Sequence, residues 1–108
     1  MQEFVDRYLT MLQVEQGYAA NTVESYRRDL RKLETFFRAH DIADPTHLSK
    51  PLWFQFLSSL KAEGLASSSI ARCLASVRGF YKSFERGKDD PTFEGILKGT
   101  PKQWSQLP

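Results

Sequence analysis

A chain of 108 residues in which 41% of the side chains are apolar is long enough for one small domain with a single hydrophobic core. Its net charge is only +2, and its lone cysteine, Cys73, excludes an intrachain disulfide and favours a reducing compartment. No apolar run approaches the roughly 18 residues of a membrane span, and the charged start of the chain (Glu3, Asp6 and Arg7) is unlike a signal peptide. We therefore expect a cytoplasmic protein without a membrane segment.

The first predicted element is a helix over residues 2–16, where apolar side chains recur at roughly helical spacing up to Gly17. Three of its charged side chains are acidic and one is basic. Because like charges repel, we expect this helix to face away from any anionic ligand.

The second predicted helix covers residues 21–38. Asn21 is a good N-cap, and Glu24 stands three residues later, as in a capping box. The apolar side chains fall at steps of three and four and predict one buried stripe: Val23, Tyr26, Leu30, Leu33 and Phe37. The other side carries polar and basic side chains: Ser25, Arg28, Arg31, Lys32 and Thr35. Thr22 and Ser25 lie in the first turn, where free backbone N–H groups favour phosphates. The Glu24 carboxylate would repel a phosphate there, but it could instead accept a hydrogen bond from the amino group of a cytosine.

Residues 39–49 form a turn-rich connection to a third helix. Ser49 can cap that helix, Pro51 is tolerated in its first turn, and the helix is expected to end near Gly64. The connection holds both histidines of the chain, but with a single cysteine available they lack the further ligands of a zinc site.

The fourth predicted helix covers residues 67–88, with Ser67 or Ser68 as its cap and Gly87 as its stop. Its apolar stripe is expected to be buried: Ile70, Leu74, Val77, Tyr81 and Phe84, widened by Cys73 and Phe80. The opposite side carries only small and basic side chains: Arg72, Ala75, Ser76, Gly79, Lys82, Ser83 and Arg86. A glycine within a helix costs about 1 kcal/mol relative to alanine, so Gly79 either allows a close approach or is simply tolerated.

The two helices that carry these polar faces are basic, and the rest of the chain is acidic. Residues 21–38 have a net charge of +2 and residues 67–88 of +4, so the remainder of this +2 chain sums to −4. Such a basic half is the electrostatic footprint of a nucleic-acid binder. Two alternatives stay open: a solvated outer face without a ligand, and a helical protein-interaction module whose basic face meets an acidic partner.

Four helices with short connections and no strand pattern predict an all-α fold, a four-helix bundle over residues 1–88. Residues 89–108 contain repeated Pro and Gly and are predicted to be a linker, with a short helical turn near residues 93–97. The sequence has no Gly-rich phosphate loop, no nucleophile–base pair and no metal-ligand cluster. It therefore predicts a binding module that needs no cofactor, rather than an enzyme.

Two segments of the chain carry a family pattern. Residues 17–30 read GYAANTVESYRRDL and resemble the helix-opening pattern G-x-S-x-N-T-x-x-x-Y-x-x-D-L of tyrosine recombinases. Residues 64–81 read GLASSSIARCLASVRGFY and resemble that family's segment G-L-S-x-x-S-I-x-R-x-L-S-A-L-R-x-F-Y. The first helix and the passage from Asp90 to Pro108 are similar to the same family, and most so to Xer-type recombinases of the phage integrase superfamily.

The resemblance implies an N-terminal core-binding (SAM-like) domain, a four-helix bundle that clamps double-stranded DNA together with a C-terminal catalytic domain. In this family the second and fourth helices cross the major groove. The Arg, Lys, His and nucleophilic Tyr of the catalytic domain are expected beyond residue 108, so no tyrosine of this chain is expected to be the nucleophile. The partners implied are double-stranded DNA and other recombinase protomers on that DNA, and the isolated fragment is expected to be a monomer.

The resemblance also implies which side chains contact the DNA. Base-edge or groove contacts are expected from Thr22, Glu24, Ser25 and Arg28 in the second helix and from Ser68, Ser69, Arg72 and Ser76 in the fourth. Phosphate contacts, which position the protein without reading sequence, are expected from Arg27, Arg31, Lys32, Lys82 and Arg86. By helical period alone, Arg27 lies nearer to the core edge of its helix. The same period places the other side chains on the polar faces: Ser25, Arg28, Arg72, Ser76, Lys82 and Arg86.

Overall fold

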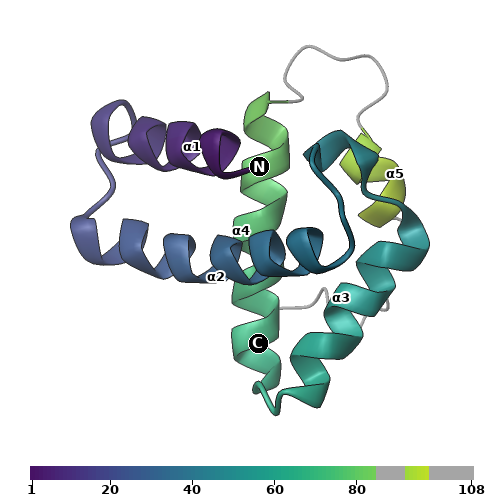
Figure 1. Cartoon of the computed structure of the whole chain (residues 1–108). Coiled ribbons are helices and arrows are strands. Elements are labelled where there is room, and N and C mark those ends of the chain that lie inside the picture. The colour runs from purple at the N-terminus through teal and green to yellow at the C-terminus, as the bar shows by residue number, and fades with distance from the viewer. Residues whose placement is uncertain (85–91, 98–108) are drawn as a thin grey trace.

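The computed structural model describes residues 1–84 and 92–97, and within these ranges the regular structure is entirely helical. The elements are, in chain order, α1 (Gln2–Val14), α2 (Ala20–Ala39), the 3-10 turn η1 (Pro45–His47), α3 (Lys50–Ala62), α4 (Ser67–Phe84) and α5 (Thr92–Leu97). Figure 1 shows α1 and α2 side by side and antiparallel, with α4 crossing both of them and α3 slanting along the other side. The predicted all-α bundle of four longer helices is confirmed, and α5 lies at the helical turn predicted near residues 93–97.

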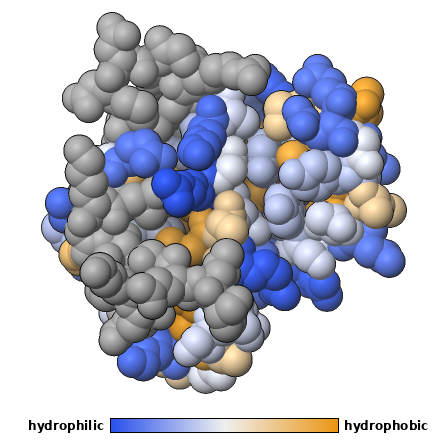
Figure 2. All heavy atoms as spheres, turned by 180° about the vertical axis from the view of Figure 1, so that it is seen from behind, coloured by the Kyte–Doolittle hydropathy of each residue, from blue (hydrophilic) through white to orange (hydrophobic). Residues whose placement is uncertain are grey.

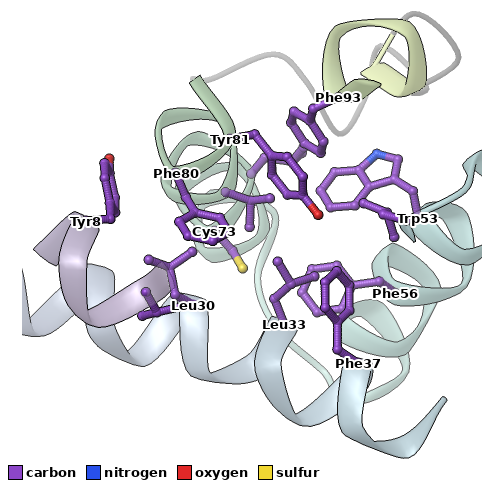
Figure 3. Close-up of a cluster of buried hydrophobic side chains, with 14 of the residues drawn as sticks. Tyr8, Leu30, Leu33, Phe37, Trp53, Phe56, Cys73, Phe80, Tyr81 and Phe93 are labelled. Carbon is purple, nitrogen blue, oxygen red and sulfur yellow. The ribbon is translucent and has the colours of Figure 1, made fainter. Parts of the chain in front are cut away.

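The core lies where α2, α3 and α4 meet. Figure 3 shows aromatic and aliphatic side chains from these helices gathered into one cluster, with Tyr8 of α1 and Phe93 of α5 at its margins. The largest side chains there are fully buried: Leu30, Leu33 and Phe37 of α2, Trp53 and Phe56 of α3, and Phe80 and Tyr81 of α4. Burying each such side chain contributes about 1.5–3 kcal/mol, so this cluster is the main source of stability. The apolar stripes predicted for α2 and α4 are confirmed for the side chains that the structure describes, with Tyr26 only partly buried.

The start of α2 differs from the prediction. Ala19 occupies the N-cap and no side chain caps the helix, so the predicted Asn21 cap is wrong. The Ala19 carbonyl already accepts from the Val23 N–H at 3.1 Å, which starts the helix before Asn21. The Glu24 carboxylate closes no capping box and lies 3.3 Å from Arg27 Nε instead. A capping hydrogen bond from one side chain is only a weak preference, and the helix already begins at Ala20, one residue before Asn21.

The other two predicted caps have different outcomes. Ser49 Oγ accepts from the Leu52 N–H at 3.4 Å, which confirms the cap of α3. At α4, the N–H of Ile70 donates to the Ala66 carbonyl at 3.0 Å, so Ala66 stands in the cap position. The predicted cap at Ser67 or Ser68 is therefore wrong, because α4 already begins at Ser67. The stop predicted at Gly87 lies outside the described residues.

Gly79 allows α4 to lie close to α1. A Cβ atom at this position would lie 2.5 Å from the hydroxyl oxygen of Tyr8, closer than such atoms approach in folded proteins. The Tyr8 ring is buried and packs edge-on against Phe80, with the ring centroids 5.9 Å apart. Burial also raises the pKa of Tyr8 to about 12. Of the two interpretations of Gly79, close approach is therefore correct, and the element that approaches is α1.

Gly79→Ala is expected to destabilise the bundle, although alanine is the better helix former by about 1 kcal/mol, because the new methyl group must displace the buried Tyr8 ring. In a Tyr8→Phe background the nearest atom is the ring carbon Cζ at 3.6 Å, an ordinary contact, and the same substitution is expected to stabilise. Urea unfolding of the wild type, Gly79→Ala, Tyr8→Phe and the double variant measures the change in the free energy of unfolding in each background. Equal changes in the two backgrounds would show that the hydroxyl group does not limit the approach of the helices.

Candidate nucleic-acid interface

A polar network fastens α2 to α4 where the two helices cross. Asp29 of α2 is 1% exposed, and its two carboxylate oxygens accept from Nε and Nη2 of Arg72 on α4, both at 3.0 Å. Ser76 Oγ donates to the same carboxylate at 3.0 Å, and the Cys73 thiol donates to the Asp29 backbone carbonyl at 3.7 Å. Because the three residues that donate these hydrogen bonds all lie on α4, the network fixes how the two helices cross.

Asp29 is the residue that sequence interpretation missed. It stands three residues after Tyr26 and four before Leu33, at the border of the apolar stripe of α2. A carboxylate at such a position is costly to bury without a cation and hydrogen-bond donors. That cost is one signal in the sequence, because it requires a basic partner from another element, although it does not say which one. The second signal is the D of the recombinase pattern, which falls on Asp29.

The prediction that Ser76 faces outward is wrong. Its side chain is fully buried, and its hydroxyl oxygen lies 3.0 Å from the Asp29 carboxylate and 3.1 Å from the Arg72 carbonyl. Ser76 lies one helical turn from Arg72, on the side of α4 that packs against α2, where a buried hydroxyl group is satisfied by the carboxylate. A groove contact from Ser76 is therefore not part of the candidate interface.

Arg72 belongs both to the network and to the surface. Its side chain is 49% exposed, and its bonds to Asp29 use two of the five guanidinium N–H donors. The hydrogen bonds to Asp29 raise the pKa of Arg72 above its usual value, so the guanidinium stays charged throughout the neutral range. Arg72 therefore remains available to an acceptor outside the bundle while its orientation is fixed from within.

The Cys73 thiol lies where α2 and α4 cross, and it donates to the backbone carbonyl of Asp29. Burial raises the pKa of the Cys73 thiol to about 12, and Asp29 adds to this effect, whereas Lys32 and Arg72 act in the opposite direction. Cys73 itself is fully buried, as the sequence predicts for a small apolar side chain.

The other predicted contact residues that the structure describes lie at or near the surface. On α2, Arg28 Nη2 donates to Ser25 Oγ at 3.3 Å, which draws this arginine toward the start of the helix. Arg86 lies outside the described residues. The exposed members of the set are Thr22, Glu24, Arg28, Arg31, Ser68, Arg72 and Lys82, and the half-buried ones are Ser25, Lys32 and Ser69.

Arg27 points toward α1 rather than toward the crossing with α4. Its Nη1 lies 3.8 Å from a carboxylate oxygen of Asp6, and its Nε lies 3.3 Å from one of Glu24. Ion pairs at the surface contribute little stability, but two nearby carboxylates weaken the attraction of this arginine for a phosphate. This position agrees with the helical period of α2, which gives no reason to favour Arg27 as a contact residue.

Figure 2 shows hydrophilic side chains over much of the described surface seen from behind, where apolar side chains appear only in small patches.

Within residues 1–84 and 92–97, no His, Cys, Asp and Glu side chains gather in a group of three that could hold a metal ion. Nor is any helix in this described part of the chain long and apolar enough to cross a bilayer.

Comparison with known proteins identifies one family and a set of similar relatives. The family described as the phage integrase N-terminal SAM-like domain matches residues 5–88. Over its whole length the chain is 32% identical to the tyrosine recombinase XerD of Staphylococcus aureus strains Mu50 and N315, and 33% identical to that of Staphylococcus haemolyticus strain JCSC1435. It spans 37% of the length of each of these relatives. No solved structure gives a significant match. Because the family match covers most of the chain, and agrees with the patterns in residues 17–30 and 64–81, the chain belongs to the phage integrase N-terminal SAM-like domain family.

Proposed function

We propose that this chain binds double-stranded DNA as the N-terminal domain of a tyrosine recombinase, and holds the duplex while another part of the protein breaks and rejoins it. The observation that supports this most directly is that α2 and α4, which the Asp29–Arg72 contact fastens together, both carry exposed cations. The chain spans only 37% of the length of relatives named tyrosine recombinases, so recombination is assigned to the whole protein. In this proposal the chain itself is no enzyme, and it acts in the cytoplasm beside other protomers on DNA.

The cations on the outer faces of α2 and α4 suit the phosphate backbone of a duplex. Arg31 and Lys82, which are expected to contact phosphates, are exposed, and so is Arg28, which is expected in the groove. Such cations gain affinity by releasing the counterions that condense on DNA. Asp29 lies between the two arginines in the sequence, but it is buried and bound to Arg72. It therefore adds no exposed negative charge to this face.

The outer face of α4 also suits close approach to base edges. Ser68 and Ala75 are exposed, and with Arg72 they recur at steps of four and three along one face of the helix. Small side chains let a helix enter the major groove, where a serine hydroxyl and an arginine fork can both read base edges. Ser68 and Arg72 are therefore the proposed base contacts of α4.

Titrating a short duplex into the isotopically labelled chain tests the proposal, with amide chemical shifts recorded at low and at moderate salt. Residues 22–32 of α2 and 68–82 of α4 are expected to shift. The shifts are expected to reverse as the salt concentration rises, because salt opposes the release of counterions from phosphates. Shifts confined to α1, or no shifts, would reject DNA binding and favour the helical protein-interaction module.

Two double variants of equal charge separate the proposed face from general charge attraction. Arg31→Gln/Lys32→Gln removes two cations from α2, and Arg7→Gln/Lys50→Gln removes two exposed cations from α1 and α3. The logarithm of the binding constant falls against the logarithm of salt with a slope of about −0.9 for each phosphate neutralised. The α2 variant is therefore expected to reduce the magnitude of the slope by about 2, and the control variant to keep the wild-type slope. Equal slopes in the two variants would place the DNA contacts elsewhere.

A further inference from the structure

We propose that Asp29 is a positioning residue for the reading of DNA sequence: it holds the Arg72 guanidinium in one orientation, so that the remaining donors of that group face a base edge. The inference rests on the proposed function, because it assigns a role in DNA recognition to a buried residue. Asp29 is 1% exposed, whereas the Arg72 side chain is half exposed. Asp29 therefore acts through Arg72 and not by direct contact with DNA.

The contact between the two side chains fixes the plane of the guanidinium. Nε of Arg72 lies 3.0 Å from Oδ2 of Asp29, and Nη2 lies 3.0 Å from Oδ1, which is the bidentate arrangement of an arginine with a carboxylate. This edge uses two of the five donors and leaves the end of the fork, formed by Nη1 and the second hydrogen of Nη2, directed away from the carboxylate. The end of an arginine fork can bind the O6 and N7 atoms of guanine.

Asp29 is itself held in place. Its carboxylate also accepts from Ser76 Oγ at 3.0 Å, and its backbone carbonyl accepts from the Cys73 thiol at 3.7 Å. An arginine that is free on a surface loses rotamer freedom when it binds a base, and this loss lowers affinity. Because the bundle already fixes Arg72, that freedom is lost on folding rather than on binding. A fixed fork also discriminates between bases, since it cannot turn to suit a different pattern of acceptors.

A purely structural role predicts a different outcome. Fastening α2 to α4 does not require a charge, since apolar residues of similar volume fill buried positions without the cost of desolvating a carboxylate. A structural role would lower the stability of Asp29 variants and leave the base preference of the folded protein unchanged. A positioning role changes the base preference of molecules that remain folded.

The test compares the base preferences of variants of the 108-residue chain. Each protein is incubated at low salt with a pool of short duplexes whose central positions are randomised, and the bound fraction is sequenced. Asp29→Asn keeps the shape of the side chain but removes its charge. Glu34→Gln is the matched control, because it removes a carboxylate from the same helix. The Glu34 carboxylate lies 3.6 Å from Arg38 of α2 and so pairs with no residue of α4. Arg72→Lys keeps the positive charge but lacks the planar fork.

The wild-type chain is expected to enrich guanine at one or more positions. In Asp29→Asn and in Arg72→Lys this enrichment is expected to fall by about 10-fold while total DNA binding persists, and in Glu34→Gln it is expected to stay. Adding Asp29→Asn to Arg72→Lys is expected to cause no further change in base preference, because Asp29 acts through Arg72.

Four results would overturn the inference or its basis. Unchanged guanine enrichment in folded Asp29→Asn would reject the positioning role, and so would wild-type binding without any base preference. Circular dichroism checks that each variant folds. If Asp29→Asn does not fold, the Arg72→Lys variant decides, and guanine enrichment that it retains would overturn the inference. Absence of any duplex binding by the wild-type chain would instead reject the proposed function.

Discussion

Replacing Phe93 with alanine is expected to lower the free energy of unfolding by about 3–5 kcal/mol, a large part of the stability of a small domain. The Phe93 ring is 1% exposed, stacks on Tyr81 with the ring centroids 4.5 Å apart, and meets Trp53 edge-on at 5.1 Å. Its removal leaves a cavity beside two fully buried aromatic rings, each of which loses a ring contact. Urea unfolding followed by circular dichroism measures the loss.

The same measurement tests where the folding unit ends. The boundary at residue 88 stays a prediction, and it assigns Phe93 and Ile96 to a linker, yet both side chains are buried in the core. A chain that ends at residue 88 is therefore expected to be at least as unstable as the Phe93→Ala variant. Phe54→Ala, at a half-buried position of α3, is the control and is expected to cost less. Unchanged stability of the shortened chain would support the boundary at residue 88.

Arg72→Ala is expected to lower the free energy of unfolding by about 2–4 kcal/mol. Of the three side-chain hydrogen bonds to the Asp29 carboxylate, the substitution leaves only the one from Ser76. A carboxylate that is 1% exposed and no longer faces a cation is costly, whereas the half-exposed guanidinium adds little stability through its own burial. Urea unfolding at neutral pH measures the effect.

Arg78→Ala provides the matched control, because it removes the same side chain from the same helix. Arg78 lies 3.7 Å from Glu94 with side chains 54% and 41% exposed, and exposed ion pairs contribute about 0–1 kcal/mol. Adding Asp29→Asn to Arg72→Ala is expected to recover part of the loss, because the buried group is then neutral. Similar losses for Arg72→Ala and Arg78→Ala would contradict a role of Arg72 in compensating a buried charge.

Most of the fold could be predicted because the period of apolar side chains is set by the geometry of the helix. Leu30, Leu33 and Phe37 recur at steps of three and four and are all fully buried, as that period requires. The start of α2 could not be predicted as well, because a capping preference is a weak local term. The tight turn at Gly17, with φ +69°, leads the chain into the helix before Asn21.

The candidate interface could be predicted only in part. A helical period separates the centre of the outer face from the centre of the core, and it places Arg28, Arg31 and Lys82 on the surface correctly. It does not decide border positions such as Asp29 and Ser76, whose burial depends on which helix packs there. The partner of Asp29 lies 43 residues away in the sequence, beyond any local rule. That the outer residues contact DNA stays a prediction.

An arginine whose charge is balanced by a carboxylate 3.0 Å away contributes little to the long-range field of a domain. Under the proposed function, exposed cations such as Arg28, Arg31 and Lys82 attract a duplex from a distance and govern how fast the two associate. Arg72 acts only at hydrogen-bonding range, once the helix lies in the groove, and governs how long the complex lasts on a particular sequence. Encounter and retention then depend on different basic side chains, so the domain can search DNA quickly without staying on every sequence that it meets.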